Sequence, residues 1–492
     1  MNARAAIISL IILLAVSGIG VFLLRPAPPA PATVPSWLAR LSTTPVERLE
    51  FRVGDRVAVM VERRGAAWFV STPDGSRPDW PADETRVRGL ISLLAESASS
   101  PSAPAASPAE PSANSVTLRT ASGESFVLAA RQSPIGGRCT LLTNDDPPGT
   151  TTERAVDCAI SQVLSPETVI SFWPRHAAFP AAGIPPSRIR LETGGYLLEL
   201  SKTRGRWNVL VPFATPADAD ASNSLAAILE QLGAARLIGA PDAMTRTWAA
   251  SPTTFIEIES APVGDDRRVL VQELRIGGTA DPGTLLAQAR AEWLDTAANT
   301  RSPAWGPMVL TVDRAATESL TPDLAAFASK RSVQTPAPDI GGLWLGPCGS
   351  PDALRQDRAL NLPRKEVLSA SEFGRVRFER TIDGWRKITI GTTGAVLSPA
   401  ETSNLASLLK ALCESPAAGI TPDLPPGTAC AGALVLTDST GAPVAVVGIG
   451  SVPGVSPNLI VRAGRLYRVY GGKEIAPLAA WMNDLLAESE TP

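Results

Sequence analysis

The chain has 492 residues, of which 44% are hydrophobic, and its formal net charge is −3. This length suits about three domains of ordinary size, each with enough apolar residues for a core. Charges of both signs are scattered along the chain, which argues against a nucleic-acid partner, since that needs a concentrated basic patch. The same scatter argues against a polybasic mode of membrane-surface binding.

The N-terminus carries the chain's one long apolar run. Ala5 to Leu24 holds no charged residue and lies between Arg4 and Arg25. As a helix the run spans about 30 Å, one hydrocarbon thickness. We therefore predict a transmembrane anchor in residues 1–25. A cleaved signal peptide, whose apolar core is shorter, is the alternative.

The flanking charges favour a cytoplasmic N-terminus. Five cysteines, a single histidine and a proline-rich tether suit an exported domain. We expect a single-pass protein of the inner membrane with its C-terminal bulk in the periplasm or outside. Residues 26–36 are typical of an extended spacer, and residues 97–115, rich in Ser, Ala and Pro, indicate a disordered insert.

One sequence pattern occurs three times. Apolar residues follow a proline at nine, twelve and thirteen positions in each copy, which is the spacing of one helix face. A proline and an acidic residue at the front suit a helix N-terminus. The three fronts are Pro81-Ala82-Asp83, Pro216-Ala217-Asp218 and Pro399-Ala400-Glu401, and the apolar sets are Leu90, Leu93 and Leu94; Leu225, Ile228 and Leu229; Leu408, Ala411 and Leu412.

A tryptophan precedes each of these fronts, at Trp68, Trp207 and Trp385. Short alternating segments lie around and before it, as in a β-meander. The predicted unit is three strands and a helix, and the fold class is α+β with antiparallel sheets backed by helices. The equivalent tryptophans favour core packing, and the alternative is an exposed platform for glycans or partners.

We expect three domains beyond the spacer, at residues 37–184, 185–345 and 346–492. The 97–115 insert lies in the first. A degraded fourth unit in the third domain would comprise strands at Ala433–Val447 and Leu466–Val469 and a last helix near Lys473–Glu488.

We expect two local disulfides if the chain lies in an oxidising compartment. Cys139 pairs best with Cys158, and Cys413 with Cys430. Each closes a loop of about twenty residues and contributes about 3 kcal/mol. Five buried thiols are the alternative, and pairings that use Cys348 stay open.

The sequence holds no catalytic motif that we can identify. His176 is the only histidine, so no site can use two histidine ligands, and a packed or solvent-edge role is favoured. Asp79, Asp83 and Glu84 form an acidic group at a helix start, where capping explains them better than acid–base chemistry. We expect no catalytic, cofactor-binding or metal-binding residue, no cofactor and no small-molecule ligand.

The anchor and the repeated pattern together resemble the bacterial family called domain of unknown function 4340, over residues 46–418. The residues that carry the resemblance are Arg64-Gly65-Ala66-Ala67-Trp68 with Pro81-Ala82-Asp83, Gly205-Arg206-Trp207 with Pro216-Ala217-Asp218, and more loosely Gly384-Trp385 with Pro399-Ala400-Glu401. The resemblance implies an extracytoplasmic accessory subunit that acts with an ABC-2-type permease or a gliding-motility-like auxiliary membrane protein. It implies no catalytic residue. The cysteines and the 97–115 insert depart from the family pattern.

Three functions remain as hypotheses. The favoured one is a non-catalytic accessory or scaffold protein of an ABC-transporter-associated complex. The alternative is a structural protein of the cell envelope that binds glycan or peptidoglycan through exposed tryptophans. A carboxylate-dependent hydrolase is less favoured, although its two carboxylates can lie far apart in a chain.

Overall fold

The computed structural model describes most of the chain between residues 41 and 485. The described residues are 41, 44–54, 56–97, 102–104, 114–132, 139–145, 150–156, 172–181, 184–260, 268–346, 376–389, 394–451, 459–463, 465–471, 478, 480–482, 484 and 485. The predicted anchor and spacer lie outside them, as does most of the 97–115 insert. Within the described part, no helix is long and apolar enough to cross a membrane.

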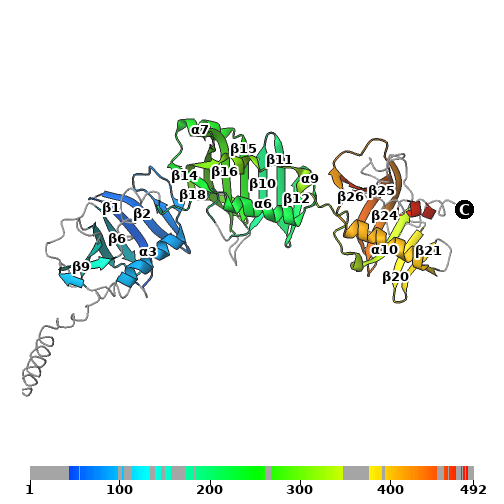
Figure 1. Cartoon of the computed structure of the whole chain (residues 1–492), viewed down its shortest axis with the longest axis horizontal. Helices are drawn as coiled ribbons and strands as arrows, with labels where there is room; N and C mark the ends of the chain where they lie inside the picture. The colour runs from blue at the N-terminus through cyan, green and yellow to red at the C-terminus, as the bar shows by residue number, and fades with distance from the viewer. Residues whose placement is uncertain are drawn as a thin grey trace, which may run out of the picture. The chain divides into compact units, whose positions relative to one another are not determined.

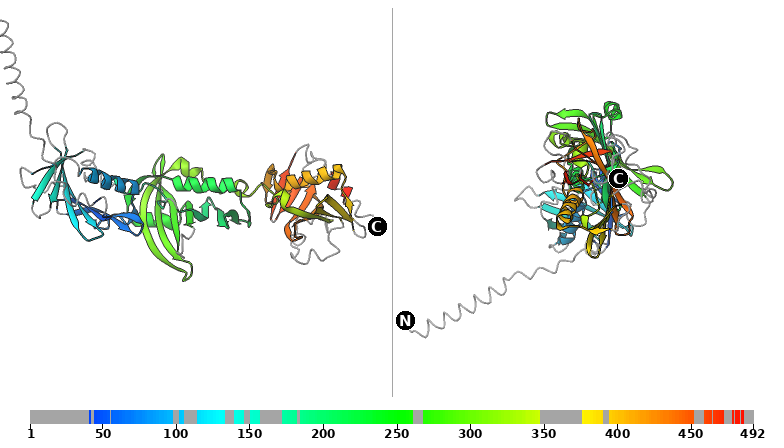
Figure 2. Two further views of the ribbon diagram at one scale, coloured as in Figure 1. Left: turned by 90° about the horizontal axis from the view of Figure 1, so that it is seen from below. Right: turned by 90° about the vertical axis from the view of Figure 1, so that its right-hand side faces the viewer.

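Three sheets of nine strands dominate the structure, each with one long helix along one face (Figure 1 and Figure 2). The α+β class expected from the sequence is therefore confirmed. The chain divides into two compact units: residues 1–176, 236–241 and 305–309 form one, and the remaining residues form the other.

The first sheet has the strand order β4-β3-β2-β1-β6-β7-β8-β9-β5, and all its neighbouring strands are antiparallel. Its strands are β1 (Val46–Val53), β2 (Arg56–Arg64), β3 (Ala67–Ser71), β4 (Trp80–Pro81), β5 (Ser102–Pro104), β6 (Asn114–Thr120), β7 (Ser125–Gln132), β8 (Cys139–Asp145) and β9 (Thr150–Val156). The helix α3 (Glu84–Ser97) lies between β4 and β5 in the chain. It packs Val87, Leu90 and Leu94 into the core of this sheet.

The second sheet has the order β13-β12-β11-β10-β15-β16-β17-β18-β14. Its strands are β10 (Pro186–Thr193), β11 (Tyr196–Thr203), β12 (Arg206–Val211), β13 (Thr215–Pro216), β14 (Ala234–Gly239), β15 (Thr254–Ser260), β16 (Arg268–Asp281), β17 (Thr284–Asp295) and β18 (Thr300–Asp313). Four helices accompany it: α6 (Ala219–Gln231), α7 (Ala243–Ala250), α8 (Arg314–Glu318) and α9 (Leu324–Phe327).

The third sheet has the order β22-β21-β20-β19-β24-β25-β26-β27-β23 and is antiparallel throughout. Its strands are β19 (Ile340–Gly346), β20 (Val376–Thr381), β21 (Gly384–Thr389), β22 (Ala395–Val396), β23 (Gly419–Thr421), β24 (Ala429–Asp438), β25 (Pro443–Ser451), β26 (Leu459–Ala463) and β27 (Leu466–Tyr470). The 3-10 turn η1 (Ala337–Asp339) precedes β19, and α10 (Pro399–Cys413) lies between β22 and β23 in the chain.

The three sheets share one strand order and one irregularity of register. In each, the first strand pairs with the sixth at the centre of the sheet, and the pairing shifts near the start of the first strand. Such a bulge re-aims the side chains that follow it. The shifts fall at Val46/Arg48, Pro186/Arg188 and Ile340/Gly342, and the apolar pairs that follow are Leu49 with Leu118, Ile189 with Ile258, and Leu343 with Leu436.

The residues predicted as a degraded fourth unit lie in the third sheet. Ala433–Val447 spans parts of β24 and β25, and Leu466–Val469 lies in β27. The expectation of a separate unit was wrong because alternation identifies a strand but not the sheet that the strand joins. Residues 478, 480–482, 484 and 485 are helical, as expected, and Leu478, Met482 and Leu485 join the core of the third sheet.

The hydrogen bonds at the three helix starts show which residues of the three sequence copies are equivalent, and they change the alignment predicted for the third copy. The backbone N–H groups of Ala82, Ala217 and Leu397 donate to the carbonyl oxygens of the three tryptophans, Trp68, Trp207 and Trp385. The next residue caps the helix in each case, and these caps are Asp83, Asp218 and Ser398. Pro399 and Glu401 therefore do not correspond to the prolines and aspartates of the other fronts.

Pro399 instead occupies the first turn of α10. Glu401 is the third helical residue and completes a capping box with Ser398: the Ser398 backbone N–H donates to Glu401 Oε2 at 2.9 Å, and the Glu401 N–H donates to Ser398 Oγ at 3.3 Å. These hydrogen bonds hold the pKa of Glu401 below its ordinary value. The sequence pattern placed the start of this helix about one turn too late. Residues three or four apart lie on the same helix face, so the apolar spacing also fits from the wrong start.

Replacing Ser398 with alanine removes this cap. We expect α10 to lose about 1 kcal/mol of stability, the usual cost of an N-cap deletion. Hydrogen exchange of the first turn of α10 measures the loss. Ser403→Ala, at an exposed position of the same helix, is the matched control, and equal effects of the two changes would contradict the assignment of the cap.

The aligned helices bury the same two positions. The residues seven and eleven places after the cap are buried in all three sheets: Leu90 and Leu94, Leu225 and Leu229, Leu405 and Leu409. The residue ten places after the cap differs. Leu93 is partly buried, Leu408 is 1% exposed and Ile228 is 46% exposed.

Candidate functional site

The tryptophans predicted from the sequence serve the cores. Trp68 and Trp207 are 6% and 4% exposed, and Trp385 is partly buried against the third core. Trp207 also donates from Nε1 to the side-chain oxygen of Asn223 in α6 at 2.9 Å. Trp37 lies outside the described residues, and none of the other tryptophans is exposed. The described surface therefore offers no tryptophan platform.

The cysteine of α10 is not in a disulfide. Cys413 is a free thiol, 2% exposed, in the core of the third sheet. Burial and the charge of Glu414 raise the pKa of this thiol to about 11. The predicted bond between Cys413 and Cys430 is therefore wrong. Spacing along the chain did not reveal that the helix directs its last cysteine inward.

Of the two cysteines in the first predicted disulfide, only Cys139 lies among the described residues. Cys139, in β8, is disulfide-bonded and 1% exposed. Its predicted partner Cys158 lies outside the described residues, and so does Cys348.

The polar residues considered for catalysis do not form a site. His176 lies exposed on the surface. The three acidic residues of the first helix start each pair with an arginine: Asp79 with Arg64, Asp83 with Arg86 and Glu84 with Arg88. No cluster of histidine, cysteine and carboxylate side chains suited to a metal ion occurs among the described residues.

A layer of arginine and glutamate covers the second sheet on the face away from α6. Side chains alternate along a strand, so the charged residues between the buried leucines and isoleucines share this face. Glu273 of β16 is only 4% exposed. Its carboxylate accepts hydrogen bonds from Arg290 at 2.8 and 2.9 Å and from Arg275 at 3.0 Å. A carboxylate so buried is tolerated only when its charge is balanced in this way.

Arginine charges also set the ionisation of Glu273. Burial raises the pKa of this carboxyl, but the hydrogen bonds and charges of Arg290 and Arg275 outweigh burial and hold the pKa below its ordinary value. A second cluster lies beside it, where Arg188 donates to Glu199 at 2.9 Å and to Glu259 at 2.8 Å.

The other two sheets carry smaller versions of this layer. Glu50 of β1 is 2% exposed and pairs with three arginines, Arg48, Arg52 and Arg119, at 3.0 to 3.4 Å. In the third sheet, Arg377 lies 4.6 Å from the ring centre of Trp344 and pairs with Glu379. We did not predict these charged faces, although the alternation was visible in Arg-Leu-Glu-Phe-Arg at 48–52 and Arg-Ile-Arg-Leu-Glu at 188–192.

Glu257 is the exception in the charged layer. It lies on β15 opposite Arg190 and Glu273, and it forms no ion pair with the described residues. Burial, followed by the charges of Glu259 and Glu273, raises the pKa of its carboxyl above the ordinary value. Folding therefore makes ionisation of Glu257 less favourable than it is in the unfolded chain.

Glu257→Gln should stabilise the protein at neutral pH. A carboxyl whose pKa is raised by folding contributes stability below its unfolded pKa and loses that contribution as the pH rises through its folded pKa. The advantage of the glutamine variant should therefore grow as the pH rises from about 4 to about 7, as measured by melting temperatures. Glu259→Gln, on the same strand, removes a partner of Arg188 and should destabilise instead. A Glu257→Gln variant less stable than wild type at neutral pH would refute the assignment.

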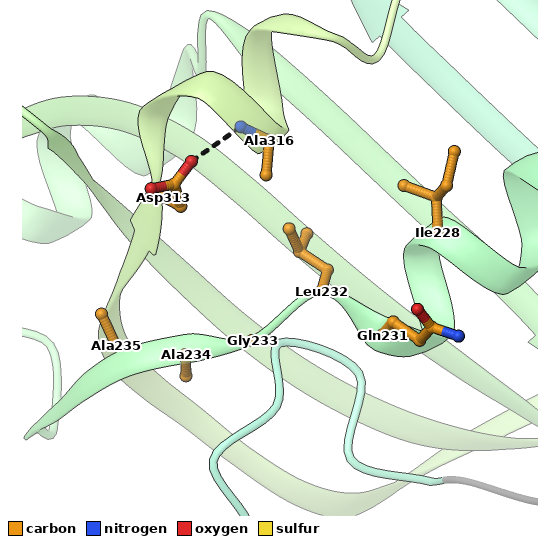
Figure 3. Close-up of a pocket in the computed structure, with 8 residues that line it drawn as sticks. All are labelled: Ile228, Gln231, Leu232, Gly233, Ala234, Ala235, Asp313 and Ala316. Atoms are coloured by element: carbon orange, nitrogen blue, oxygen red, sulfur yellow. Dashed lines mark hydrogen bonds between the residues drawn. The ribbon is translucent and has the colours of Figure 1, made fainter.

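An apolar pocket of about 400 Å³ lies between the end of α6, the start of β14 and α8 (Figure 3). Ile228 and Leu232 line it on one side and Ala316 of α8 on another. The carboxylate of Asp313 also borders it but is used to cap α8, accepting from the Ala316 N–H at 2.8 Å. The pocket therefore offers apolar contact and no available charge.

In comparisons with known proteins, no family model, no curated protein and no solved structure matches this chain.

Proposed function

We propose that this chain is a non-catalytic scaffold of the bacterial envelope, anchored in the inner membrane by residues 1–25. In this proposal the three sheets are copies of one repeated unit, and the protein acts as an extracytoplasmic accessory subunit of an ABC-transporter-associated complex. The observation that carries the proposal is the strand order and central bulge common to the three sheets. Repeated units extend a surface along a chain, which suits assembly better than a single reaction.

The charged layers support a role in assembly. The least exposed glutamates, Glu50 and Glu273, are held by several arginines each. Such networks fix charged side chains on a sheet face that α7 covers beside Arg275, and they leave the paired arginines partly exposed. Fixed charges of both signs favour selective contact with a partner protein.

The two rival functions have weaker support. Glycan binding through tryptophans needs exposed rings, and none of the described tryptophans is exposed. A carboxylate-dependent hydrolase needs two carboxylates that face a substrate, and the acidic residues considered from the sequence are engaged with arginines or helix caps.

A pull-down of the tagged full-length protein in mild detergent from its native membrane tests the proposal. Mass spectrometry should identify a permease and an ATPase in the eluate. An unrelated tagged single-pass protein of the same membrane is the control for carry-over. Repeated recovery of the protein without a membrane partner would overturn the proposal.

A further inference from the structure

A second pocket in the second sheet has the polar character that the apolar pocket lacks. It measures about 440 Å³. It lies between the ends of β10 and β16, the starts of β15 and β17, and α8 with the loop that follows. Leu285 and Leu320 contribute apolar surface. Six threonines line it: Thr193, Thr253, Thr254, Thr279, Thr317 and Thr321.

The space arises because the segments that follow the ninth strand differ between the second and third sheets. In the third sheet, the helical residues after β27 insert Leu478, Met482 and Leu485 into the core. In the second sheet, α8 has the sequence Arg-Ala-Ala-Thr-Glu and buries only Thr317. A short helix of small side chains leaves both pockets beside it unfilled.

The hydroxyl groups of this pocket keep unused hydrogen-bonding capacity. Thr253 donates to the Ile276 carbonyl at 3.0 Å, and Thr317 donates to the Asp313 carbonyl at 2.8 Å. A hydroxyl that donates can still accept, so both oxygens remain acceptors. Thr279 accepts from Arg314 at 3.5 Å and keeps its O–H as a donor.

The pocket carries no net charge. Arg314 is the only cation of its lining, and it pairs with Glu318 at 3.5 Å and donates to the Pro282 carbonyl at 3.0 Å. A bound anion would have to compete with Glu318, and a cation would meet Arg314. Donors and acceptors of neutral hydroxyls remain, together with two leucines.

We propose that this threonine-lined pocket binds a neutral, hydroxyl-rich ligand of one or two sugar rings. A volume of about 440 Å³ falls within the range of small-molecule sites. The ligand's hydroxyls donate to Thr253 and Thr317 and accept from Thr279, while its ring carbons contact Leu285 and Leu320. This binding activity does not depend on the scaffold function.

Calorimetric titration of the full chain in detergent with glucose, maltose, N-acetylglucosamine and chitobiose tests the proposal. At least one sugar should saturate one site per chain with a dissociation constant of about 1 mM or lower. Sodium sulfate and choline chloride, the charged probes, should not bind there. Failure of all four sugars to saturate would overturn the proposal, as would competition by sulfate.

Two variants locate the binding. Thr317→Val and Thr279→Val should each weaken the sugar about tenfold, the effect of one lost hydrogen bond. Thr247→Val is the matched control, because its hydroxyl also donates to the carbonyl four residues earlier, that of Ala243, but lies outside the pocket. Thr279 is exposed, so its variant keeps the test valid if Thr317→Val unfolds. Sugar binding unchanged in the Thr279→Val variant would refute the site.

Discussion

Leu408→Ala should destabilise the third sheet by about 2–5 kcal/mol, the range for a buried leucine that leaves a cavity. Leu408 is 1% exposed in α10 and belongs to the core of the third sheet. Ile228 holds the same position relative to its helix cap in α6, yet it is 46% exposed. Ile228→Ala should therefore cost less than about 1 kcal/mol.

Hydrogen exchange followed by mass spectrometry compares the two changes in the full chain, because it reports each helix separately. Peptides from α10 should exchange faster in Leu408→Ala, and peptides from α6 should be little changed in Ile228→Ala. Equal costs would mean that the alignment by helix caps is wrong. A small cost for Leu408→Ala alone would mean that the third core readily collapses around the cavity.

Trp173→Ala should destabilise the first sheet by about 3–5 kcal/mol. The Trp173 side chain is 0% exposed, with ring centres 5.1 Å from Phe51 and 5.0 Å edge-on from Phe172. Its Nε1 has no hydrogen-bond partner within the described part of the chain, so we expect the loss to come from packing rather than from a broken hydrogen bond. Trp173→Phe keeps an aromatic ring and removes the unpaired N–H, and it should recover much of the stability.

Exchange of β1 and β2 measures this effect, since Phe51 lies in β1. Val127→Ala, at a position 37% exposed on β7, is the control and should change stability by less than about 0.5 kcal/mol. If Trp173→Phe were as destabilising as Trp173→Ala, the aromatic contact with Phe51 would not be the source of the stability.

Local patterns predicted the three long helices and many of the strands, but not the short helices α7, α8 and α9. Leu90, Leu94, Leu225 and Leu229 were assigned to the buried helix faces, where they lie. The third helix was placed one turn out of register, because Leu405, Leu408, Leu409 and Leu412 satisfy the helical spacing from two starting points. Only the hydrogen bonds of Ser398 and Glu401 settle which start is used.

Long-range features were not accessible from the sequence. The segment that contains β24 and β25 was recognised as strand-like, but the pairing of β24 with β19 depends on contacts distant in the chain. The inward direction of Cys413 and the pockets beside α8 depend on packing in three dimensions. The charged faces were accessible in principle, because charge alternation along one strand is a local signal.

The central pairing of each sheet also determines the order in which the chain can fold. The first four strands of each sheet, of which the fourth is only two residues long, pair in the order in which they follow one another in the chain. The sixth to the ninth strands also pair in chain order. Only the contact between the first and sixth strands, such as Leu49 with Leu118, and that of the fifth with the ninth join distant residues. The chain can therefore form two local meanders before the two distant pairings of each sheet close. Each sheet completes before the next begins, which limits the time for which unpaired strands of different sheets are exposed to one another.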